Sequence, residues 1–119
     1  MAQPSRTRND FMLALQYFDQ KEFEKANVLF EDLFDSNPDG IYPYYYKSLL
    51  EVKELSKAEK ITKKQLKRNP QNVYLYVYLA RIYKKLEDEK KVKESYDKAI
   101  KEVENIPQQV QALVNALVE

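Results

Sequence analysis

Reactive side chains are scarce in this sequence. It contains no cysteine and no histidine, which excludes thiol nucleophiles, histidine bases and histidine–metal sites. The single glycine excludes the glycine-rich loops that hold phosphates, and no serine lies in a nucleophile motif. Glu31 and Asp35 lie one helical turn apart, but carboxylate pairs on a charged helix normally face solvent. We therefore expect no catalytic residue, no metal site and no cofactor.

Tyrosine is the abundant side chain that can recognise a ligand. The 119 residues include ten tyrosines and no tryptophan, and eight of the tyrosines lie in two short stretches, 42–46 and 74–83. Tyrosine offers apolar area and a hydroxyl at a small cost in side-chain entropy. An aromatic stripe at helical spacing is also typical of a protein core, so the sequence leaves both interpretations open. Recognition of another molecule is the chemistry that this composition favours.

The overall composition is typical of a helical protein. With one glycine and five prolines, the chain has too few turn residues for many short strands. Twenty Lys and Arg against 19 Asp and Glu give a net charge of +1, so there is no global attraction to nucleic acid or membrane. No apolar run is long enough to span a bilayer. We expect a soluble protein of the cytoplasm or of the periplasm, in the second case as a mature form lacking its signal peptide.

Two stretches share a pattern of small and large residues at the same internal distances. The first has Leu13, Ala14 and Tyr17 with Ala26, Phe30 and Pro38, and the second has Leu79, Ala80 and Tyr83 with Val92 and Tyr96. The pattern resembles the tetratricopeptide repeat (TPR), a helix-turn-helix unit of about 34 residues. A small residue allows the two helices to cross closely, large residues fill the groove beside it, and the proline ends the second helix.

The resemblance implies an all-α fold, in which residues 1–119 form a single domain. We expect a right-handed superhelix of three TPR-like repeats at residues 6–38, 39–70 and 71–106, followed by a closing C-terminal helix at 108–118. The expected helices span residues 6–19, 22–36, 41–53, 56–68, 72–86, 89–105 and 108–118.

The segment VYLYVYLARIY, residues 73–83, has the β-branched and aromatic residues of a strand. As a helix it is apolar on nearly every side and needs neighbours on each face. The repeat register favours the helix, because the first helix of an internal repeat contacts its own partner and both neighbouring repeats.

The middle repeat departs most from the pattern. The interval from Ala26 to Ala58 is 32 residues, two short of the repeat. We place the deletion in the turn between its helices, near residues 53–55. This leaves the register of its first helix open, since either Ser48 or Tyr46 could face the partner helix.

Several helix starts are indicated by capping residues. Ser56 and Glu59 have the spacing of a capping box, and Asn72 and Asp88 are expected to cap the two following helices. In the link 37–40, we expect Gly40 to supply the backbone freedom for a sharp reversal.

The TPR resemblance also implies a concave surface, built mainly from the first helix of each repeat, on which family members typically hold extended peptides or partner helices. The matching residues of this chain are Phe11, Leu15, Phe18, Tyr42, Tyr45, Tyr46, Leu49, Tyr74, Val77, Tyr78 and Arg81. Seven of these eleven are aromatic, and exposed apolar patches generally mark partner sites. We expect a non-catalytic protein-interaction scaffold that binds an apolar or aromatic-rich peptide or a partner helix, with Arg81 pairing a carboxylate.

One ligand class of the family does not fit these positions. Some TPR proteins clamp the C-terminal carboxylate of heat-shock chaperones with Lys, Arg and Asn from three successive repeats. The matching places of the first two repeats hold Phe11, Leu15, Tyr46 and Leu49. Positive charge is offered only by Arg81, Lys84 and Lys85, so we do not expect a dicarboxylate clamp.

Charge on the second helices suggests an alternative function. Residues 17–40 carry a net charge of −5 and residues 53–68 one of +5, so the two segments should lie side by side. The alternative is that the basic segment docks on nucleic acid or an anionic membrane through Lys57, Lys60, Lys63, Lys64, Lys67 and Arg68. No aromatic residue interleaves these cations, so bases would have no stacking platform and we expect neither partner. Salt-sensitive binding would favour this alternative.

The C-terminal segment is apolar on more than one side. One helical stripe suits docking onto the third repeat and consists of Val110, Leu113, Val114 and Leu117. Ala112, Ala116 and Val118 leave much of the other side apolar, whereas a terminal capping helix should be polar outside. We therefore interpret the chain as the N-terminal part of a longer protein, and expect self-association through the C-terminal helix as one outcome in isolation. The alternative is a complete small protein whose last helix caps the stack.

Overall fold

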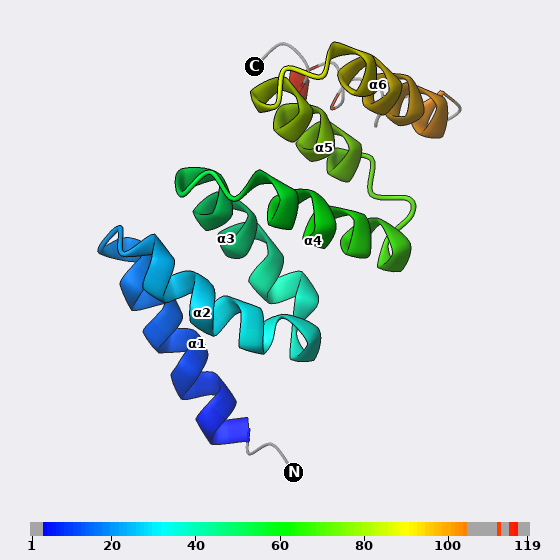
Figure 1. The fold of residues 1–119 in the computed structure, drawn as a ribbon. Helices are drawn as coiled ribbons and strands as arrows, with labels where there is room; N and C mark the ends of the chain where they lie inside the picture. The colour runs from blue at the N-terminus through cyan, green and yellow to red at the C-terminus, as the bar shows by residue number, and fades with distance from the viewer. Residues whose placement is uncertain (1–3, 105–111, 113–114, 117–119) are drawn as a thin grey trace. The chain divides into compact units, whose positions relative to one another are not determined.

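The computed structural model describes residues 4–104, 112, 115 and 116 (Figure 1). This part of the chain is helical and contains no strand, which confirms the predicted all-α helical repeat fold. Its elements are α1 (Pro4–Asp19), α2 (Phe23–Leu33), the 3₁₀ helix η1 (Phe34–Ser36), α3 (Pro38–Glu51), α4 (Leu55–Arg68), α5 (Tyr74–Lys85) and α6 (Glu89–Val103).

Two compact parts make up the chain: an N-terminal body, Met1–Ile61, and a C-terminal body, Thr62–Glu119. The division falls inside α4, within the second predicted repeat. In the N-terminal body α2 packs between α1 and α3, and in the C-terminal body α5 packs against α6 (Figure 1). The proposed division into three repeats of one domain stays a prediction.

Helix α5 confirms the helical interpretation of residues 73–83. Its strand-like composition is explained by burial, because the side chains of Leu75, Val77, Leu79 and Ile82 are all at most 5% exposed. A helix with so little solvent-facing surface can be rich in β-branched and aromatic residues, since tertiary packing outweighs local propensity.

All three helical hairpins turn in the same way. The turns are residues 20–22, 52–54 and 86–88, and the middle residue of each has a left-handed backbone, with φ of 62° at Lys21, 60° at Lys53 and 59° at Glu87. In the first turn the amide of Glu22 donates to the carbonyl of Tyr17, and that of Lys21 donates to Phe18. The same pair of bonds recurs in the other two turns. This is the Schellman arrangement, which satisfies the last carbonyls of each first helix.

These turns fix the register of the middle repeat and correct the predicted place of the deletion. The interval from Lys21 to Lys53 is 32 residues and that from Lys53 to Glu87 is 34, although the turns themselves have equal length. The shortening lies instead in the link between repeats, where Asn37 alone separates η1 from α3, whereas residues 69–73 separate α4 from α5. Counting from the turns, Tyr46 occupies the place of Ala14 and Ala80. Ser48 instead contacts α2, where its Oγ donates to the carbonyl of Phe23 at 3.3 Å.

Asn37 caps α3 and explains Gly40. The Asn37 side chain accepts a hydrogen bond from the Gly40 amide at 3.3 Å, and Pro38 is the first residue of the helix, where its missing N–H costs nothing. The prediction that Gly40 provides a sharp reversal is wrong, because Gly40 lies in the first turn of α3 without a positive φ. A Cβ at Gly40 would lie 2.5 Å from Nδ2 of Asn37. Glycine is needed here to make room for the cap.

Gly40→Ala should therefore have an effect that depends on Asn37. In the native chain, the gain of about 1 kcal/mol in helix propensity is offset by loss of a cap worth about 1 kcal/mol, so stability should barely change. In an Asn37→Ala background only the gain remains, and Gly40→Ala should stabilise by about 0.5–1 kcal/mol. Urea unfolding of the four chains measures this coupling, and equal effects of Gly40→Ala in both backgrounds would contradict it.

The other predicted caps have mixed outcomes. Asp88 caps α6 as predicted, with its carboxylate accepting from the Lys91 amide at 3.1 Å. Asn72 accepts from the amide of Tyr74 at 3.2 Å, but the N-cap residue of α5 is Val73, one position later than predicted. The Ser56 capping box is wrong, because α4 already begins at Leu55 and the carbonyl of Glu54 accepts its first helical bond from Ala58 at 3.1 Å. Ser56 lies inside the first turn.

Small residues at the predicted crossing positions are fully buried. Ala14 and Ala26 are 0% exposed in the N-terminal body, as is Ala80 in the C-terminal body. One hydrophobic cluster in the core of the C-terminal body consists of Val73, Val77, Ala99 and Val103, with Tyr76 and Ala116 packed against it.

Ala116 is half-buried and packs against Val73, Val77, Ala99 and Val103, so the expectation that it lies on the outer side of the closing segment is wrong. Ala112 is half-buried as well. The predicted docking stripe and Val118 lie outside the described residues. The docking of that stripe stays a prediction.

Candidate functional site

The structure divides the eleven predicted groove residues into core and surface. Tyr42, Tyr45, Tyr46 and Leu49 are between 0 and 6% exposed, and Val77 is 2% exposed. These five side chains have almost no surface to offer a ligand. Accessible surface remains on Phe11, Leu15, Phe18, Tyr74, Tyr78 and Arg81.

The register derived from the turns explains why the groove residues predicted for the second repeat are buried. Tyr45, Tyr46 and Leu49 occupy the places of Leu79, Ala80 and Tyr83, which are core in the third repeat. Tyr42 occupies the place of Tyr76, which is half-buried. The positions equivalent to the predicted residues of the first and third repeats are Gly40, Pro43, Tyr44, Lys47 and Leu50, none of which the sequence analysis included. Pro43, Tyr44 and Lys47 are exposed and Leu50 is half-buried. Aligning the three repeats on their turns, which have equal length, would have identified these positions despite the unequal links between repeats.

Tyr44 is the centre of an aromatic cluster in the N-terminal body. Its ring lies edge-on to Phe18 and Phe11, with centroids 5.6 and 6.3 Å away, and is stacked on Phe30 at 6.5 Å. Phe30 is fully buried, whereas Tyr44 is 39% exposed. The cluster therefore reaches from the core to a surface shared by α1 and α3. We call the accessible rings of Phe11, Phe18 and Tyr44 the aromatic face.

A pocket of about 320 Å³ lies in the C-terminal body, and we call it the α5 pocket. Its lining residues are Tyr74, Val77, Tyr78, Arg81, Ala112, Asn115 and Ala116. Tyr74 is 40% exposed, and the Arg81 guanidinium carbon lies 5.6 Å from the centroid of the Tyr78 ring. Stacking on an aromatic ring restrains the orientation of a guanidinium. The pocket therefore combines apolar walls, a positioned cation and the amide of Asn115.

The corrected register also bears on the dicarboxylate clamp. Tyr46 and Leu49, on which its exclusion partly depended, belong to the core, and the exposed equivalent of Leu15 and Arg81 in the second repeat is Lys47. Phe11 and Leu15 remain apolar at the matching places of the first repeat. The expectation of no clamp thus depends on the first repeat alone.

Two glutamates act on the buried phenol of Tyr45. Burial, followed by the negative charges of Glu31 and Glu54, raises the pKa of Tyr45 to about 12. The Tyr45 ring lies between Phe30 and Phe34, each at a centroid distance of 5.9 Å.

This shift predicts loss of stability at high pH. The folded pKa lies above the ordinary value of 10, so the neutral phenol contributes stability that is fully present below pH 10 and is lost as pH rises through about 12. Between these values Tyr45→Phe should show a smaller fall in melting temperature than the native chain, because the buried group no longer ionises on unfolding. Equal falls, measured by thermal melts followed by circular dichroism, would contradict the assignment.

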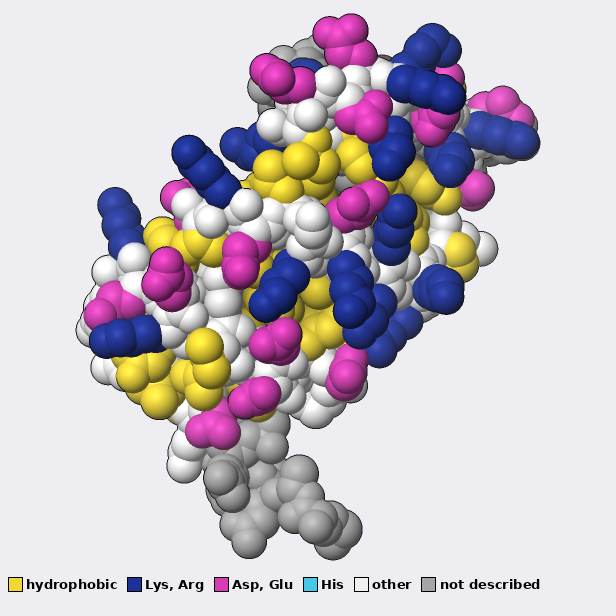
Figure 2. Space-filling view, viewed as in Figure 1, with side chains coloured by type: hydrophobic (Ala, Val, Ile, Leu, Met, Phe, Trp, Pro, Cys, Tyr) yellow, Lys and Arg dark blue, Asp and Glu magenta, His cyan; other side chains and the backbone are white. Residues whose placement is uncertain are grey.

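The basic residues of α4 are exposed, and Figure 2 shows Lys and Arg side chains gathered over this helix. Within the N-terminal body, Lys57 Nζ lies 3.7 Å from Glu31 Oε1 of α2. This contact confirms that the acidic segment and the start of the basic one lie side by side. Both side chains are about half exposed, so the pair contributes little energy.

The described part of the chain has no cluster of metal-ligating side chains and no membrane-spanning helix. No group of three His, Cys, Asp or Glu side chains there could hold a metal ion. No helix among the described residues has the length and apolar character required to cross a bilayer.

No protein-family model matches the chain, and no curated protein is similar to it in sequence. Solved structures are similar in fold. A MamA structure covers 82% of this chain with 17% identity and a TM-score of 0.70, and the chain spans 57% of the length of that protein. PcrH from Pseudomonas aeruginosa covers 99% of this chain, which in turn spans 91% of PcrH, with 10% identity and a TM-score of 0.76.

A third similar structure is described as the first TPR of Spaghetti (RPAP3) bound to an HSP90 peptide, SRMEEVD. It covers 99% of this chain, which spans 98% of it, with 14% identity and a TM-score of 0.67. At these identities the likeness concerns the fold. The equal Schellman turns, the buried small residues at the crossings and these structures together identify the fold of the chain as TPR-like.

Proposed function

We propose that this chain is a non-catalytic protein-interaction scaffold that binds an extended peptide, placing an apolar side chain and a carboxylate in the α5 pocket. The main support for this proposal is that Arg81 lies over the ring of Tyr78, beside the exposed ring of Tyr74. A cation held against apolar walls suits a ligand group that combines apolar surface with negative charge. The TPR-like fold supports the proposal, since the similar RPAP3 domain binds a peptide.

The aromatic face of the N-terminal body is a second surface of the same character. Met12, on the same helix as Phe11 and Phe18, is also apolar and is 63% exposed. Exposed aromatic and apolar side chains lose unfavourable contact with water when a partner covers them. In this proposal the aromatic face and the α5 pocket are separate contact surfaces, the first for apolar side chains and the second for a group that carries a carboxylate.

Selection from a library of random displayed peptides tests the proposal. The full chain is the bait, and the selected peptides should share aromatic or aliphatic residues with an acidic side chain or a free C-terminal carboxylate. Synthetic peptides are then titrated by fluorescence anisotropy. Arg81→Gln should weaken binding about tenfold or more, because it removes a charge-assisted hydrogen bond. A version of the peptide with its carboxylate replaced by an amide should lose about as much and be insensitive to Arg81→Gln.

Lys101→Gln is the matched control, because Lys101 is exposed on α6 and does not line the α5 pocket. It removes the same charge and should leave affinity unchanged. Affinity that falls equally in both variants, and falls steeply with salt, would overturn the proposal in favour of a basic docking surface. Failure of Tyr78→Ala to weaken binding would also contradict it.

A further inference from the structure

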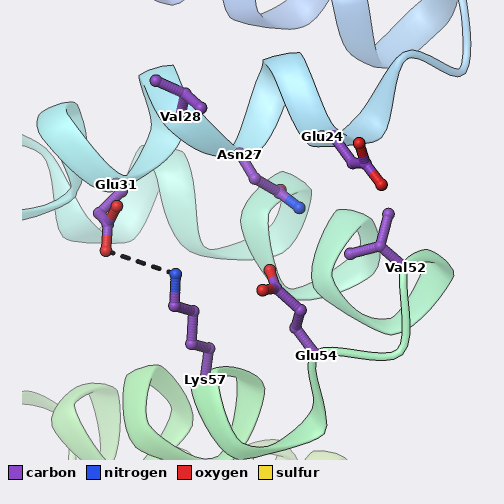
Figure 3. Close-up of a pocket in the computed structure, with 7 residues that line it drawn as sticks. All are labelled: Glu24, Asn27, Val28, Glu31, Val52, Glu54 and Lys57. Carbon is purple, nitrogen blue, oxygen red and sulfur yellow. Dashed lines mark ion pairs between the residues drawn. The ribbon is translucent and has the colours of Figure 1, made fainter.

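A second pocket lies in the N-terminal body, formed by α2, the 52–54 turn and the start of α4 (Figure 3). Its volume is about 280 Å³, and it is lined by Glu24, Asn27, Val28, Glu31, Val52, Glu54 and Lys57. None of these residues belongs to the aromatic face or to the α5 pocket. We call it the α2 pocket.

Asn27 is the unusual member of this lining. Its side chain is 8% exposed, and neither its Nδ2 nor its Oδ1 has a hydrogen-bond partner. Figure 3 shows its amide pointing from α2 into the space beside Glu54 and Val52. Leaving a buried amide unpaired costs about 1–3 kcal/mol. A ligand that hydrogen-bonds to this amide would recover part of that cost.

The charged residues around Asn27 indicate whether such a ligand would be positively or negatively charged. Three carboxylates and one ammonium line the α2 pocket, a net formal charge of −2. Lys57 pairs with Glu31 at 3.7 Å, while Glu24 and Glu54 have no ion-pair partner within the described residues. The negative charges of Glu31 and Glu54 also act on the neighbouring Tyr45 phenol. The pocket therefore favours a cation.

The geometry favours an organic cation over a metal ion. No three carboxylates of the described residues converge closely enough to hold a metal. The acceptors come instead from different elements, Glu24 and Asn27 from α2 and Glu54 from the turn, around an opening far larger than an ion. A guanidinium carries five N–H donors in one plane and can reach several separated acceptors together, which an ammonium does less well.

We propose that the α2 pocket binds an arginine side chain of a partner protein. The guanidinium donates hydrogen bonds to the carboxylates of Glu24 and Glu54 and to Oδ1 of Asn27, and its alkyl stem lies on Val52. The charge complementarity and the unpaired amide carry this assignment. It does not depend on the peptide-binding function proposed for the α5 pocket.

The probe for this proposal is Nα-acetyl-L-arginine amide, titrated into the ¹⁵N-labelled full chain and followed by NMR. Saturable shifts are expected at the Asn27 side-chain amide and at the backbone amides of Val52 and Glu54. The neutral isostere Nα-acetyl-L-citrulline amide should give none of them, and Nα-acetyl-L-lysine amide should bind several-fold more weakly. Equal shifts with citrulline, or shifts spread over all acidic residues, would overturn the proposal.

Two variants distinguish specific binding in the α2 pocket from nonspecific attraction to the negative charge of the N-terminal body. Glu54→Gln should weaken arginine binding about tenfold, whereas Asp32→Asn, an equal charge change on α2 outside the pocket, should leave it unchanged. Equal weakening by both variants would contradict the proposal.

Asn27→Leu should abolish binding while raising the melting temperature, because it replaces an unpaired buried amide by an apolar group of similar size. If this variant loses stability, its binding result is set aside and the Glu54 and Asp32 pair decides the question. Unchanged arginine binding by a folded Asn27→Leu variant would overturn the role of the amide.

Discussion

Phe30→Ala is expected to destabilise the N-terminal body by about 3–5 kcal/mol, which is a large share of the 5–15 kcal/mol that typically holds a domain folded. Phe30 is 0% exposed, and its ring lies against Phe18, Tyr44 and Tyr45 at centroid distances of 6.4, 6.5 and 5.9 Å. Truncation to alanine would remove the contact shared by α1, α2 and α3. The measurement is urea unfolding followed by circular dichroism.

The matched control is Val28→Ala on the same helix. Val28 is 63% exposed, so its truncation should change stability by less than about 0.5 kcal/mol. A loss for Phe30→Ala similar to that of the control would mean that the aromatic cluster does not organise the N-terminal body. The unfolding curve of Phe30→Ala should also lose cooperativity if the C-terminal body remains folded, which would show that the two bodies unfold separately.

Tyr45→Ala and Tyr44→Ala form the second test, because these neighbours have opposite roles in the corrected register. Tyr45 is 3% exposed and Tyr44 39% exposed. Tyr45→Ala should cost about 3 kcal/mol or more, as large-to-small changes in a core do. Tyr44→Ala should cost about 1 kcal/mol, since it loses ring contacts but leaves no enclosed cavity.

The ligand-binding readout should show the reverse order. A peptide selected against the native chain should bind Tyr44→Ala more weakly, because the aromatic face has lost its central ring. A Tyr45→Phe variant keeps the core filled and should bind like the native chain. If Tyr44→Ala destabilises more than Tyr45→Ala, then the register in which Tyr46 is equivalent to Ala14 and Ala80 is wrong.

Local rules predicted the helices well and their ends less well. Asp88 could be recognised as a cap because a carboxylate needs only the amide three residues later. Ser56 misled because it has the same local signature two residues after the point where the Schellman turn starts α4. A capping hydrogen bond is local, but the preceding turn decides where the helix starts, and therefore whether Glu54 or Ser56 accepts the first helical bond of α4.

Gly40 misled in a different way. A lone glycine near a proline is usually a sign of unusual backbone geometry. In this chain the left-handed positions are taken by Lys21, Lys53 and Glu87, and Gly40 is required by the volume of the Asn37 side chain. Whether a glycine is needed for its backbone freedom or for its lack of a side chain depends on its neighbours in space, which the sequence pattern does not locate.

The sequence by itself determined the all-α fold and its TPR-like helical repeat. The evidence lay in the spacing of Ala14, Ala26 and Ala80, because helix crossings need small residues at fixed intervals along the chain. It also named eleven candidate surface residues, and those with accessible surface are Phe11, Leu15, Phe18, Tyr74, Tyr78 and Arg81.

Only the tertiary structure decided which tyrosines are core. Tyr44, Tyr45 and Tyr46 are consecutive and chemically identical, so their roles depend on the rotation of α3, and one residue of register turns a helix by about 100°. That rotation follows from the short link at Asn37, which shifts α3 relative to the regular repeat. The α2 pocket likewise requires α2, the 52–54 turn and α4 to be brought together in space, and no local pattern places Asn27 beside Glu54.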